Sequence, residues 1–406
     1  MKKRVAQAMG CLLVMTMMAG SLTACGGKTE TKTETETKTE AKADKKESDV
    51  RVALICSAAG QNDNGYNQSA VEGVKKAADE FGIEYKVVEP TTGVPQALES
   101  LADDGYNIIF NLEYDFEALI QGTGGAQPIA EMYPDTTFVC VNDNPNQDEN
   151  GNVIHENVIS VLFDVQQASF VAGALTTLVN ENTETLFGTD EYNFTSAEDG
   201  GRSVGFIGGT NSNGITVFSY GYIEGVNYEA EKLGVDYDYY AKYDAGFADS
   251  ATGSTVAGTY YNQGANIVFA VAGSVGDGVA SKAKEEGKLA IQVDANKDDQ
   301  QPGYILTSVI KNTEVPVYDI VKEAVNGKLD DMEAAQTYSL ASGATSITDL
   351  TEISKHVQES GKDKWEEIKA EIKEVEDKIA DGTIVVTDAQ SGEEFDASKC
   401  PNVTVK

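Results

Sequence analysis

Beginning at Val50, short apolar runs typical of buried strands alternate with stretches whose apolar residues recur at helical spacing. The strand-like runs are Val52–Cys56, Ile108–Asn111, Thr137–Val141, Val158–Phe163, Val204–Ile207, Ile267–Val271, Leu289–Val293 and Tyr304–Ser308. The helical stretches are Gln68–Phe81, Pro95–Asp103, Phe116–Met132, Val165–Asn180, Ile215–Leu233, Ser250–Gln263, Val275–Glu286 and Val315–Asn326. A strand followed by a helix, repeated along the chain, predicts an α/β fold with parallel sheets and helices on both faces.

The body that these runs span is about 350 residues long, more than one hydrophobic core usually supports. We therefore expect two α/β lobes, each with its own doubly wound parallel sheet. In such sheets ligands bind beyond the carboxyl ends of the strands, at a switch point or between lobes. The residues that directly follow each strand are thus the candidate functional residues.

The first 25 residues have the pattern of an export signal. A cationic start at Lys2–Arg4 precedes the apolar or small run Ala8–Ala19, which is shorter than the about 20 residues of a membrane-spanning helix. It ends in Leu22-Thr-Ala-Cys-Gly26, which resembles the lipobox of bacterial lipoproteins. We expect residues 1–24 to be a signal peptide and Cys25 to carry the lipid that anchors the protein to the extracytoplasmic face of the cell membrane. The alternative is an ordinary signal peptide with a chance cysteine.

Residues 25–49 differ in composition from the body that follows. From Lys28 the segment alternates Thr with charges of both signs and lacks aromatic and large aliphatic residues. Such a composition cannot bury enough apolar surface to offset the entropy of ordering, so we expect a disordered tether behind the lipid anchor.

The charge balance excludes some classes of partner. The chain has 66 Asp and Glu against 31 Lys and Arg, a formal net charge of −35. An acidic surface repels phosphate backbones, so nucleic-acid binding is not expected. The 5 Cys and 2 His are too few and too scattered for a zinc module or a disulfide scaffold, and we expect no metal site and no cofactor.

Several loops at the expected strand ends carry ligand-binding chemistry. The turn after the first strand ends in Tyr66 and Asn67, and a glycine-rich segment from Gly205 to Gly214 precedes a helix that bears Phe218. The turn Ala272–Gly278 is also rich in glycine, and another strand ends in Asp294. Aromatic rings, approachable backbone and a carboxylate together suit a planar, hydroxylated small molecule.

These segments resemble the BMP (basic membrane protein) family of nucleoside-binding lipoproteins, which serve ABC importers. The resemblance covers roughly residues 51–386 and rests on several segments in the same order. They are Asn62–Gly73, Gly205–Gly209, Phe218–Gly225, Gly264–Phe269, Gly273–Gly278, Val293-Asp294, Leu306–Lys311 and Ile379–Val386. Asn180–Arg202 is longer than the usual connection, and Asp388–Lys406 extends the usual end.

The resemblance implies a type I periplasmic-binding-protein-like fold with the ligand in the interlobe cleft. Because the chain of such a protein crosses between lobes more than once, we expect discontinuous lobes. Residues 50–163 plus 298–335 would form the first, and 164–297 plus 336–406 the second. The implied function is capture of nucleosides, above all purine nucleosides, by a monomer that delivers them to the permease and ATPase subunits of an ABC transporter.

The resemblance also implies residue roles. Tyr66, where the family usually has Phe, and Phe218 would sandwich the base, and Asp294 would accept hydrogen bonds from the ribose hydroxyls. The alternative for Phe218 is a core contact on its helix, and for Asp294 an N-cap. Lys311 is either a donor to a sugar hydroxyl or a solvated charge.

Four further polar or glycine positions complete the expected site. Asp63 and Asn67 are candidate partners of the base edge or sugar, although Asp63 could equally bond its own backbone in an Asx turn. Asp143, which follows a predicted strand, is a weaker candidate. Gly273 would let the backbone approach the ligand.

Nothing in the sequence assembles a catalytic unit, so no enzymatic activity is expected. No Ser lies on a nucleophile elbow, and no His accompanies Cys56, Cys140 or Cys400 in a catalytic motif. Cys56 and Cys140 are expected to be small buried hydrophobes, and His155 and His356 surface residues. The alternatives are a binding protein for a sugar or other small polar solute, a nucleoside-hydrolysing or deaminating surface enzyme, and a nucleoside-sensing receptor.

Overall fold

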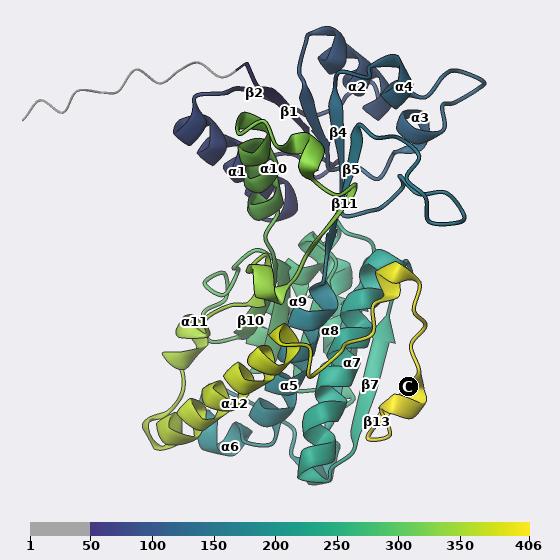
Figure 1. Ribbon diagram of the computed structural model, residues 1–406. Helices are drawn as coiled ribbons and strands as arrows, with labels where there is room; N and C mark the ends of the chain where they lie inside the picture. The colour runs from purple at the N-terminus through teal and green to yellow at the C-terminus, as the bar shows by residue number, and fades with distance from the viewer. Residues whose placement is uncertain (1–48) are drawn as a thin grey trace, which may run out of the picture. The chain divides into compact units, whose positions relative to one another are not determined.

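The computed structural model describes residues 49–406, and within them the strands form two sheets (Figure 1). The six-stranded sheet has the order β11-β5-β4-β3-β1-β2 and the seven-stranded sheet the order β12-β10-β9-β8-β6-β7-β13. The first comprises β1 (Arg51–Ile55), β2 (Glu84–Val88), β3 (Ile108–Asn111), β4 (Thr137–Val141), β5 (Val158–Phe163) and β11 (Ala335–Tyr338). The second comprises β6 (Ser203–Gly208), β7 (Tyr237–Lys242), β8 (Ile267–Val271), β9 (Leu289–Asp294), β10 (Ile305–Lys311), β12 (Thr345–Ile347) and β13 (Val403–Val405).

The strand pairs are parallel apart from β10 and β12, which run antiparallel. The parallel order confirms the predicted α/β class with two doubly wound lobes. It also places the carboxyl ends of neighbouring strands at one edge of each sheet, where ligand-binding residues gather in this class.

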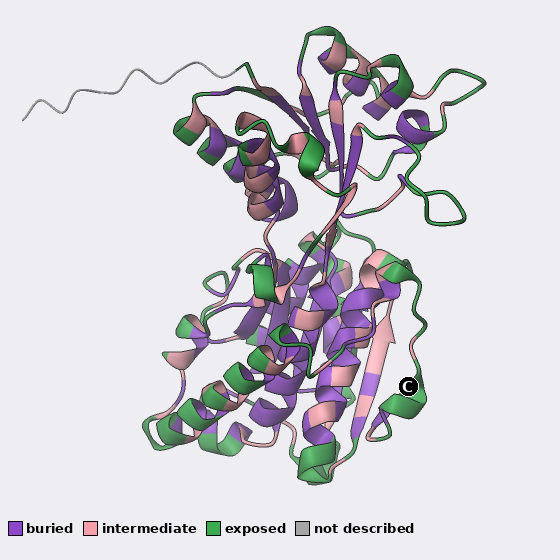
Figure 2. Cartoon of the chain, in the orientation of Figure 1, coloured by how far each residue is buried: buried purple, intermediate pink, exposed green. Residues whose placement is uncertain are grey.

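Helices cover both faces of each sheet. Those packed with the first sheet are α1 (Tyr66–Phe81), α2 (Val94–Asp103), α3 (Glu117–Ile120), α4 (Ile129–Met132) and α10 (Glu314–Val325). The others are α5 (Val165–Asn180), α6 (Thr183–Leu186), α7 (Asn213–Leu233), α8 (Ser250–Asn262), α9 (Ser274–Glu286), α11 (Thr351–Ser354) and α12 (Lys362–Ala380). Short 3₁₀ turns lie at Ala197–Asp199, Leu329–Asp331, Leu340–Ser342, Glu359–Gly361, Ala389–Ser391 and Ala397–Lys399. Figure 2 shows the strands largely buried and the outer side of α12 exposed.

The helix that carries Phe218 is fixed by close backbone packing. A Cβ at Gly221 of α7 would lie 2.2 Å from the carbonyl oxygen of Gln166 in α5, and one at Gly225 would lie 2.0 Å from that of Phe170. Only glycine allows so close an approach of the two backbones. The contact therefore holds α7 against α5 and sets the position of Phe218 in the second turn of α7.

The prediction of one helix is wrong. The stretch Phe116–Met132 forms two separate four-residue helices, α3 and α4, instead of one continuous helix. Gly122 has φ +72, and a Cβ there would lie 2.1 Å from the carbonyl oxygen of Ala126. Pro128 then occupies the N-cap of α4. Left-handed glycine and proline break the helical pattern that the apolar spacing predicted.

The chain passes between the two sheets after β5, after β10 and after β11 within residues 49–406. We expected residues 298–335 to belong with the first lobe. In the structure β10 pairs with β9, with Val309 opposite Val293, so the chain returns to the first sheet only after Lys311. It then forms α10 and β11 there before it enters β12 of the second sheet. The difference arises because β10 is an almost fully buried strand inside the sheet order, and its own sequence does not identify its partner.

The C-terminal residues after α12 run back over the second lobe. Thr387 donates its backbone N–H to Glu224 Oε2 of α7 at 3.0 Å, and Phe395 stacks on Tyr220 of α7 with ring centroids 5.0 Å apart. The chain then forms β13, which pairs with β7. This segment therefore completes the sheet edge instead of trailing from the fold.

Some expectations concern single residues. Cys56 and Cys140 are free and fully buried, as predicted. His155 is buried rather than on the surface, because its Nε2 lies 2.8 Å from the Ile120 carbonyl oxygen. The predicted signal peptide 1–24, the lipidated Cys25 and residues 25–48 of the tether lie outside the described residues. Across residues 49–406, no helix is both long and apolar enough to serve as a membrane span.

Candidate functional site

Three of the expected ligand-binding residues lie around the ammonium group of a fourth, Lys311. Its Nζ is 4.7 Å from the ring centroid of Tyr66, 5.9 Å from that of Phe218 and 3.4 Å from Asp294 Oδ1. Tyr66 begins α1 in the first lobe, whereas the other three lie in the second, in α7, at the end of β9 and at the end of β10. The structure thus joins residues that are far apart in the sequence into one cluster, which we call the Lys311 cluster.

Each aromatic ring of the cluster is also held by a contact with its own lobe. The Tyr66 phenol, 9% exposed, donates to the Val141 carbonyl oxygen at 3.1 Å. Phe218 is 2% exposed and packs edge-on against Phe269, with ring centroids 6.4 Å apart. Because each ring is fixed by its own lobe, both present a defined face to the Lys311 ammonium.

Charge in the cluster is balanced. Lys311 is 8% exposed, and burial, the largest single influence, lowers the pKa of its ammonium, but Asp294, Tyr114 and Asp63 together raise it, so that the net shift is upward. The group is therefore a charged hydrogen-bond donor. Asp294 has φ +74, a backbone conformation that is rare for a residue with a side chain. Such strained positions concentrate at functional sites.

The loop before α1 lies against this carboxylate. A Cβ at Gly65 would lie 3.5 Å from the Cβ of Asp294, so the loop touches the end of β9. The hydroxyl of Thr313, just after β10, donates to the Tyr66 carbonyl oxygen at 2.7 Å. These contacts join the start of α1 to the strand ends of the other lobe.

Asp63 and Asn67 organise this same loop. The Asp63 carboxylate accepts from the backbone N–H groups of Gly65, Asn67 and Gln68, each at 3.0 Å, and so caps α1. Asn67 is fully buried; its Oδ1 accepts from the Ser57 N–H and its Nδ2 donates to Ser57 Oγ, both at 2.8 Å. This is the local bonding that the sequence left open for Asp63. It fixes the backbone from which Tyr66 projects, while direct ligand contact by either side chain stays a prediction.

Gly273 and Asp143 each follow the end of a strand but do not take part in the contacts of the Lys311 cluster. Gly273 is the N-cap of α9 with φ +53, and a Cβ there would lie 2.8 Å from the Phe247 carbonyl oxygen. Asp143 is exposed and accepts from the Asn144 N–H at 2.8 Å. Across residues 49–406, no hydrogen bond or ion pair joins either residue to the Lys311 cluster. Their ligand roles also stay predictions.

The sequence reasoning missed two residues beside the cluster. Tyr114 follows β3 and Asn142 follows β4, and the Asn142 amide donates to the Tyr114 phenol oxygen. After burial and Asp294, Tyr114 is the next influence on the pKa of Lys311. Both residues directly follow a strand or lie within three residues of its end, so the rule that pointed to Asp294 could have found them.

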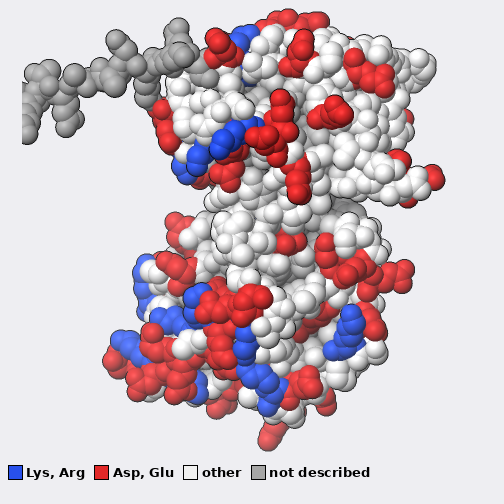
Figure 3. Space-filling model, viewed as in Figure 1, with Lys and Arg blue, Asp and Glu red and all other residues white. Residues whose placement is uncertain are grey.

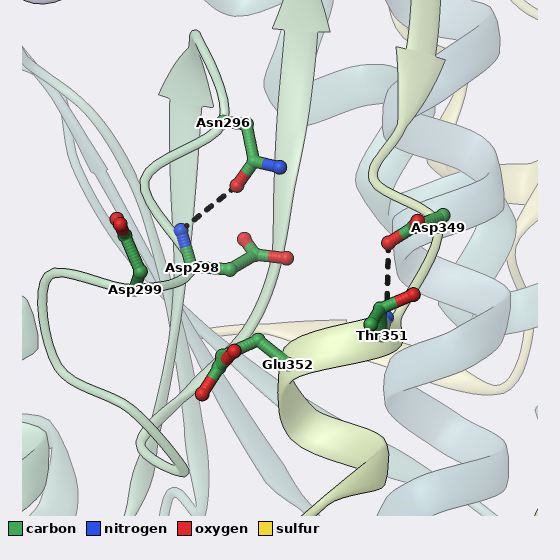
Figure 4. A pocket seen from close by; sticks show the side chains of 6 residues that line it. All are labelled: Asn296, Asp298, Asp299, Asp349, Thr351 and Glu352. Carbon is green, nitrogen blue, oxygen red and sulfur yellow. Dashed lines mark hydrogen bonds between the residues drawn. The ribbon is translucent and has the colours of Figure 1, made fainter. Parts of the chain in front are cut away.

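A separate hollow in the second lobe is acidic (Figure 4). It has a volume of about 430 Å³ and is lined by Asn296, Asp298, Asp299, Asp349, Thr351 and Glu352. The buried Asp298 carboxylate accepts from the Ser308 and Thr348 hydroxyls, and burial raises its pKa. Its oxygens are thus satisfied by protein groups. In the part of the chain that the structure describes, no group of three or more His, Cys, Asp or Glu side chains could hold a metal ion.

Comparison with known proteins identifies the family. A family model described as "ABC transporter substrate-binding protein PnrA-like" (Bmp) matches residues 50–379, well over half of the chain. The chain belongs to the Bmp family. It is therefore a substrate-binding protein of the kind that serves ABC transporters, as the sequence resemblance implied.

Relatives of this Bmp protein cover most of its length. The ABC transporter nucleoside-binding protein BmpA of Lactococcus lactis subsp. cremoris is 27% identical over 326 residues, covering 75% of this chain and 82% of that protein. An uncharacterized lipoprotein of Pyrococcus abyssi is 26% identical over 326 residues, covering 78% of this chain and 70% of that one. Several Bmp relatives are thus named as lipoproteins or as components of ABC transporters.

A solved structure supports the fold. The solute-binding protein of an ABC transporter system from Aeropyrum pernix K1 is 22% identical and superposes with a TM-score of 0.65, covering 84% of this chain and 93% of that one. At this identity the likeness shows the fold alone. It confirms the expected architecture of two parallel-sheet lobes of the type I periplasmic binding proteins.

Proposed function

We propose that this Bmp protein binds nucleosides, above all purine nucleosides, on the extracytoplasmic face of the membrane and delivers them to an ABC importer. The observation that carries the proposal is the Lys311 cluster, in which two aromatic rings, one ammonium and one carboxylate converge from both lobes. A relative of similar length is named a nucleoside-binding protein, which agrees with this chemistry.

Each part of a nucleoside has a matching group in the cluster. Tyr66 and Phe218 offer faces on which a flat base can stack, an interaction that contributes about 1–3 kcal/mol per base and tolerates different bases. Asp294 can accept hydrogen bonds from two ribose hydroxyls, and the Lys311 ammonium can donate to a sugar or base oxygen. Bonds to charged groups are the stronger class, so they would orient the sugar while stacking holds the base.

The contributions of the two lobes suggest how binding would proceed. Tyr66 belongs to the first lobe and Phe218, Asp294 and Lys311 to the second, so a molecule held by all four would bridge the lobes. We propose that the lobes close over the ligand about the segments that join β5 to α5, β10 to α10 and β11 to β12. Capture would be binding only, with no bond made or broken.

The anchor and partners belong to the same proposal. We propose that Cys25 carries lipid, that residues 25–49 tether the body, and that the protein acts as a monomer with the permease and ATPase subunits of the transporter. The face in Figure 3 carries many acidic side chains among scattered basic ones, which agrees with a protein that does not bind nucleic acid.

Mass spectrometry of small molecules that co-purify with residues 26–406, followed by calorimetric titration, tests the function. We expect a nucleoside to be released on denaturation and to rebind with one site per chain. A monosaccharide as the released and rebinding ligand would overturn the nucleoside assignment. Free base formed on incubation with inosine would overturn binding without catalysis.

A further inference from the structure

Two consecutive residues at the carboxyl end of β4 hold two tyrosine phenols. Val141 accepts a hydrogen bond from the Tyr66 phenol through its carbonyl oxygen at 3.1 Å. The next residue, Asn142, donates from its side-chain amide to the phenol oxygen of Tyr114. The ends of β3 and β4 thus place a second tyrosine beside the ring that we assign to base stacking.

Tyr114 differs from Tyr66 in exposure. It is 58% exposed, whereas Tyr66 is 9% exposed, and its ring packs edge-on against Phe116 with centroids 6.5 Å apart. Because Asn142 is the donor in their bond, the Tyr114 oxygen acts as acceptor and its O–H proton stays free to donate. Within residues 49–406, the structure records no acceptor for that proton.

Tyr114 also acts electrostatically on the Lys311 cluster. Burial is the largest influence on the pKa of Tyr66 and Tyr114 is the next, and both raise it. For Lys311, burial lowers the pKa, and Asp294 and then Tyr114 raise it. These influences agree with the bonds at Val141 and Asn142, which place the two tyrosines side by side at the end of β4.

Asn142, which bonds the exposed Tyr114, is itself buried and held by the backbone of β5. It is 7% exposed, has φ +70, and donates its backbone N–H to the Val161 carbonyl oxygen at 2.7 Å. Among residues with side chains, Asn is one of the few that tolerate this left-handed conformation. Asn142 thus combines a rare backbone conformation with burial, and its side-chain amide bonds a solvent-exposed phenol. The β4 strand does not need this bond, and such positions concentrate at functional sites.

We propose that Tyr114 is a specificity-determining ligand contact that donates its phenol O–H to an acceptor atom on the edge of the bound base, and that Asn142 positions it. The inference rests on the proposed function and deepens it. Stacking between Tyr66 and Phe218 tolerates any flat base, so it cannot by itself select one. A fixed donor at the base edge can, because a base without an acceptor there leaves the phenol unpaired.

Four variants of the mature protein test the inference by calorimetry with adenosine, inosine, guanosine, cytidine and uridine. Tyr114→Phe removes the donor and keeps the ring, and should weaken the tightest-binding nucleoside about threefold to tenfold. Asn142→Gly keeps the left-handed backbone and removes the amide, and should weaken it less. The double variant should be no weaker than Tyr114→Phe alone, since the amide acts only through the phenol. Tyr85→Phe, at an exposed tyrosine of β2, is the matched control and should change nothing.

Analogues of that nucleoside, each lacking one acceptor atom of the base, separate a direct contact from a structural role. A structural role of Tyr114 would weaken the binding of every analogue alike. One of them should bind wild-type protein and Tyr114→Phe equally. The inference is overturned if Tyr114→Phe binds as tightly as wild type, if its loss persists with every analogue, or if the effects of Asn142→Gly and Tyr114→Phe add. If wild-type protein binds none of the nucleosides, the proposed function fails and the inference with it, an outcome distinct from a wild type that binds and an unaffected Tyr114→Phe.

Discussion

Replacement of Asp294 by Ala tests the ion pair at the centre of the candidate site. Lys311 is buried, and its Nζ lies 3.4 Å from Asp294 Oδ1. Without the carboxylate, the buried ammonium keeps its desolvation cost and loses its main counter-charge. Breaking a fully buried pair costs about 3–5 kcal/mol. Because Asp294 is partly exposed, we expect the free energy of unfolding to fall by about 2–3 kcal/mol in Asp294→Ala.

The pH dependence gives this loss a signature. In wild-type protein the pKa of Lys311 is raised, so the pair stabilises the fold below the unfolded lysine pKa of about 10.4 and is lost as pH rises through the higher folded value. In Asp294→Ala, burial lowers the pKa of Lys311, with Tyr114 and Asp63 left to oppose it. The variant then gains stability as pH rises from that lowered pKa toward about 10.4. The gap between variant and wild type should therefore narrow with rising pH.

Urea unfolding followed by circular dichroism at pH 7 and pH 9.5 measures both effects. The double variant Asp294→Ala/Lys311→Met removes the unpaired charge and should recover most of the loss at pH 7. Asp135→Ala, at an exposed carboxylate before β4, is the control and should stay within about 0.5 kcal/mol of wild type. Equal stability of Asp294→Ala and wild type at pH 7, or the same gap at both pH values, would refute the reasoning about a buried pair.

The remaining predictions concern binding and anchoring. Phe218→Ala should weaken every nucleoside by about 1–3 kcal/mol in calorimetric titrations, whichever base it carries, and a loss confined to one base would contradict its role as a stacking face. Cys25→Ala should leave the protein in the soluble fraction or stalled as precursor, and normal processing with membrane retention would show that the lipoprotein assignment is wrong. Deletion of residues 28–49 from the soluble protein should leave nucleoside affinity unchanged, and a tenfold loss, about 1.4 kcal/mol, would show that the tether takes part in binding.

The fold and part of the site could be predicted because parallel sheets obey a simple rule. Apolar runs followed by helical stretches predicted both sheets, and the rule that ligands bind at carboxyl strand ends pointed to Asp294. The same rule pointed to the helix that bears Phe218, and the resemblance added Lys311, whose own position in a strand does not reveal a site. The structure then showed that all three lie together with Tyr66.

What could not be predicted depends on contacts between distant segments. The sequence of strand β10 predicts a strand but not its partner, and only its pairing with β9 assigns it to the second sheet. His155 is polar and lies in a loop, but its side chain is buried, where its Nε2 contacts the Ile120 carbonyl oxygen. The break at Gly122 and Pro128 is different, because both residue types interrupt helices and the sequence alone shows them.

The place of Lys311 next to a crossing segment links the candidate site to movement of the lobes. Lys311 ends β10, and two residues later the hydroxyl of Thr313 donates to the carbonyl oxygen of Tyr66 in the first lobe. The backbone N–H of Thr313 also donates to the Lys311 carbonyl oxygen at 3.1 Å. In the closure that we propose, a change in the angle between the lobes would bend this segment and move the ammonium relative to the Tyr66 ring. A ligand held by both groups would therefore favour one angle over others, because its contacts are complete at that angle alone. In the function that we propose, the segment that carries the binding ammonium is thus part of the hinge, and the free energy of binding acts directly on closure.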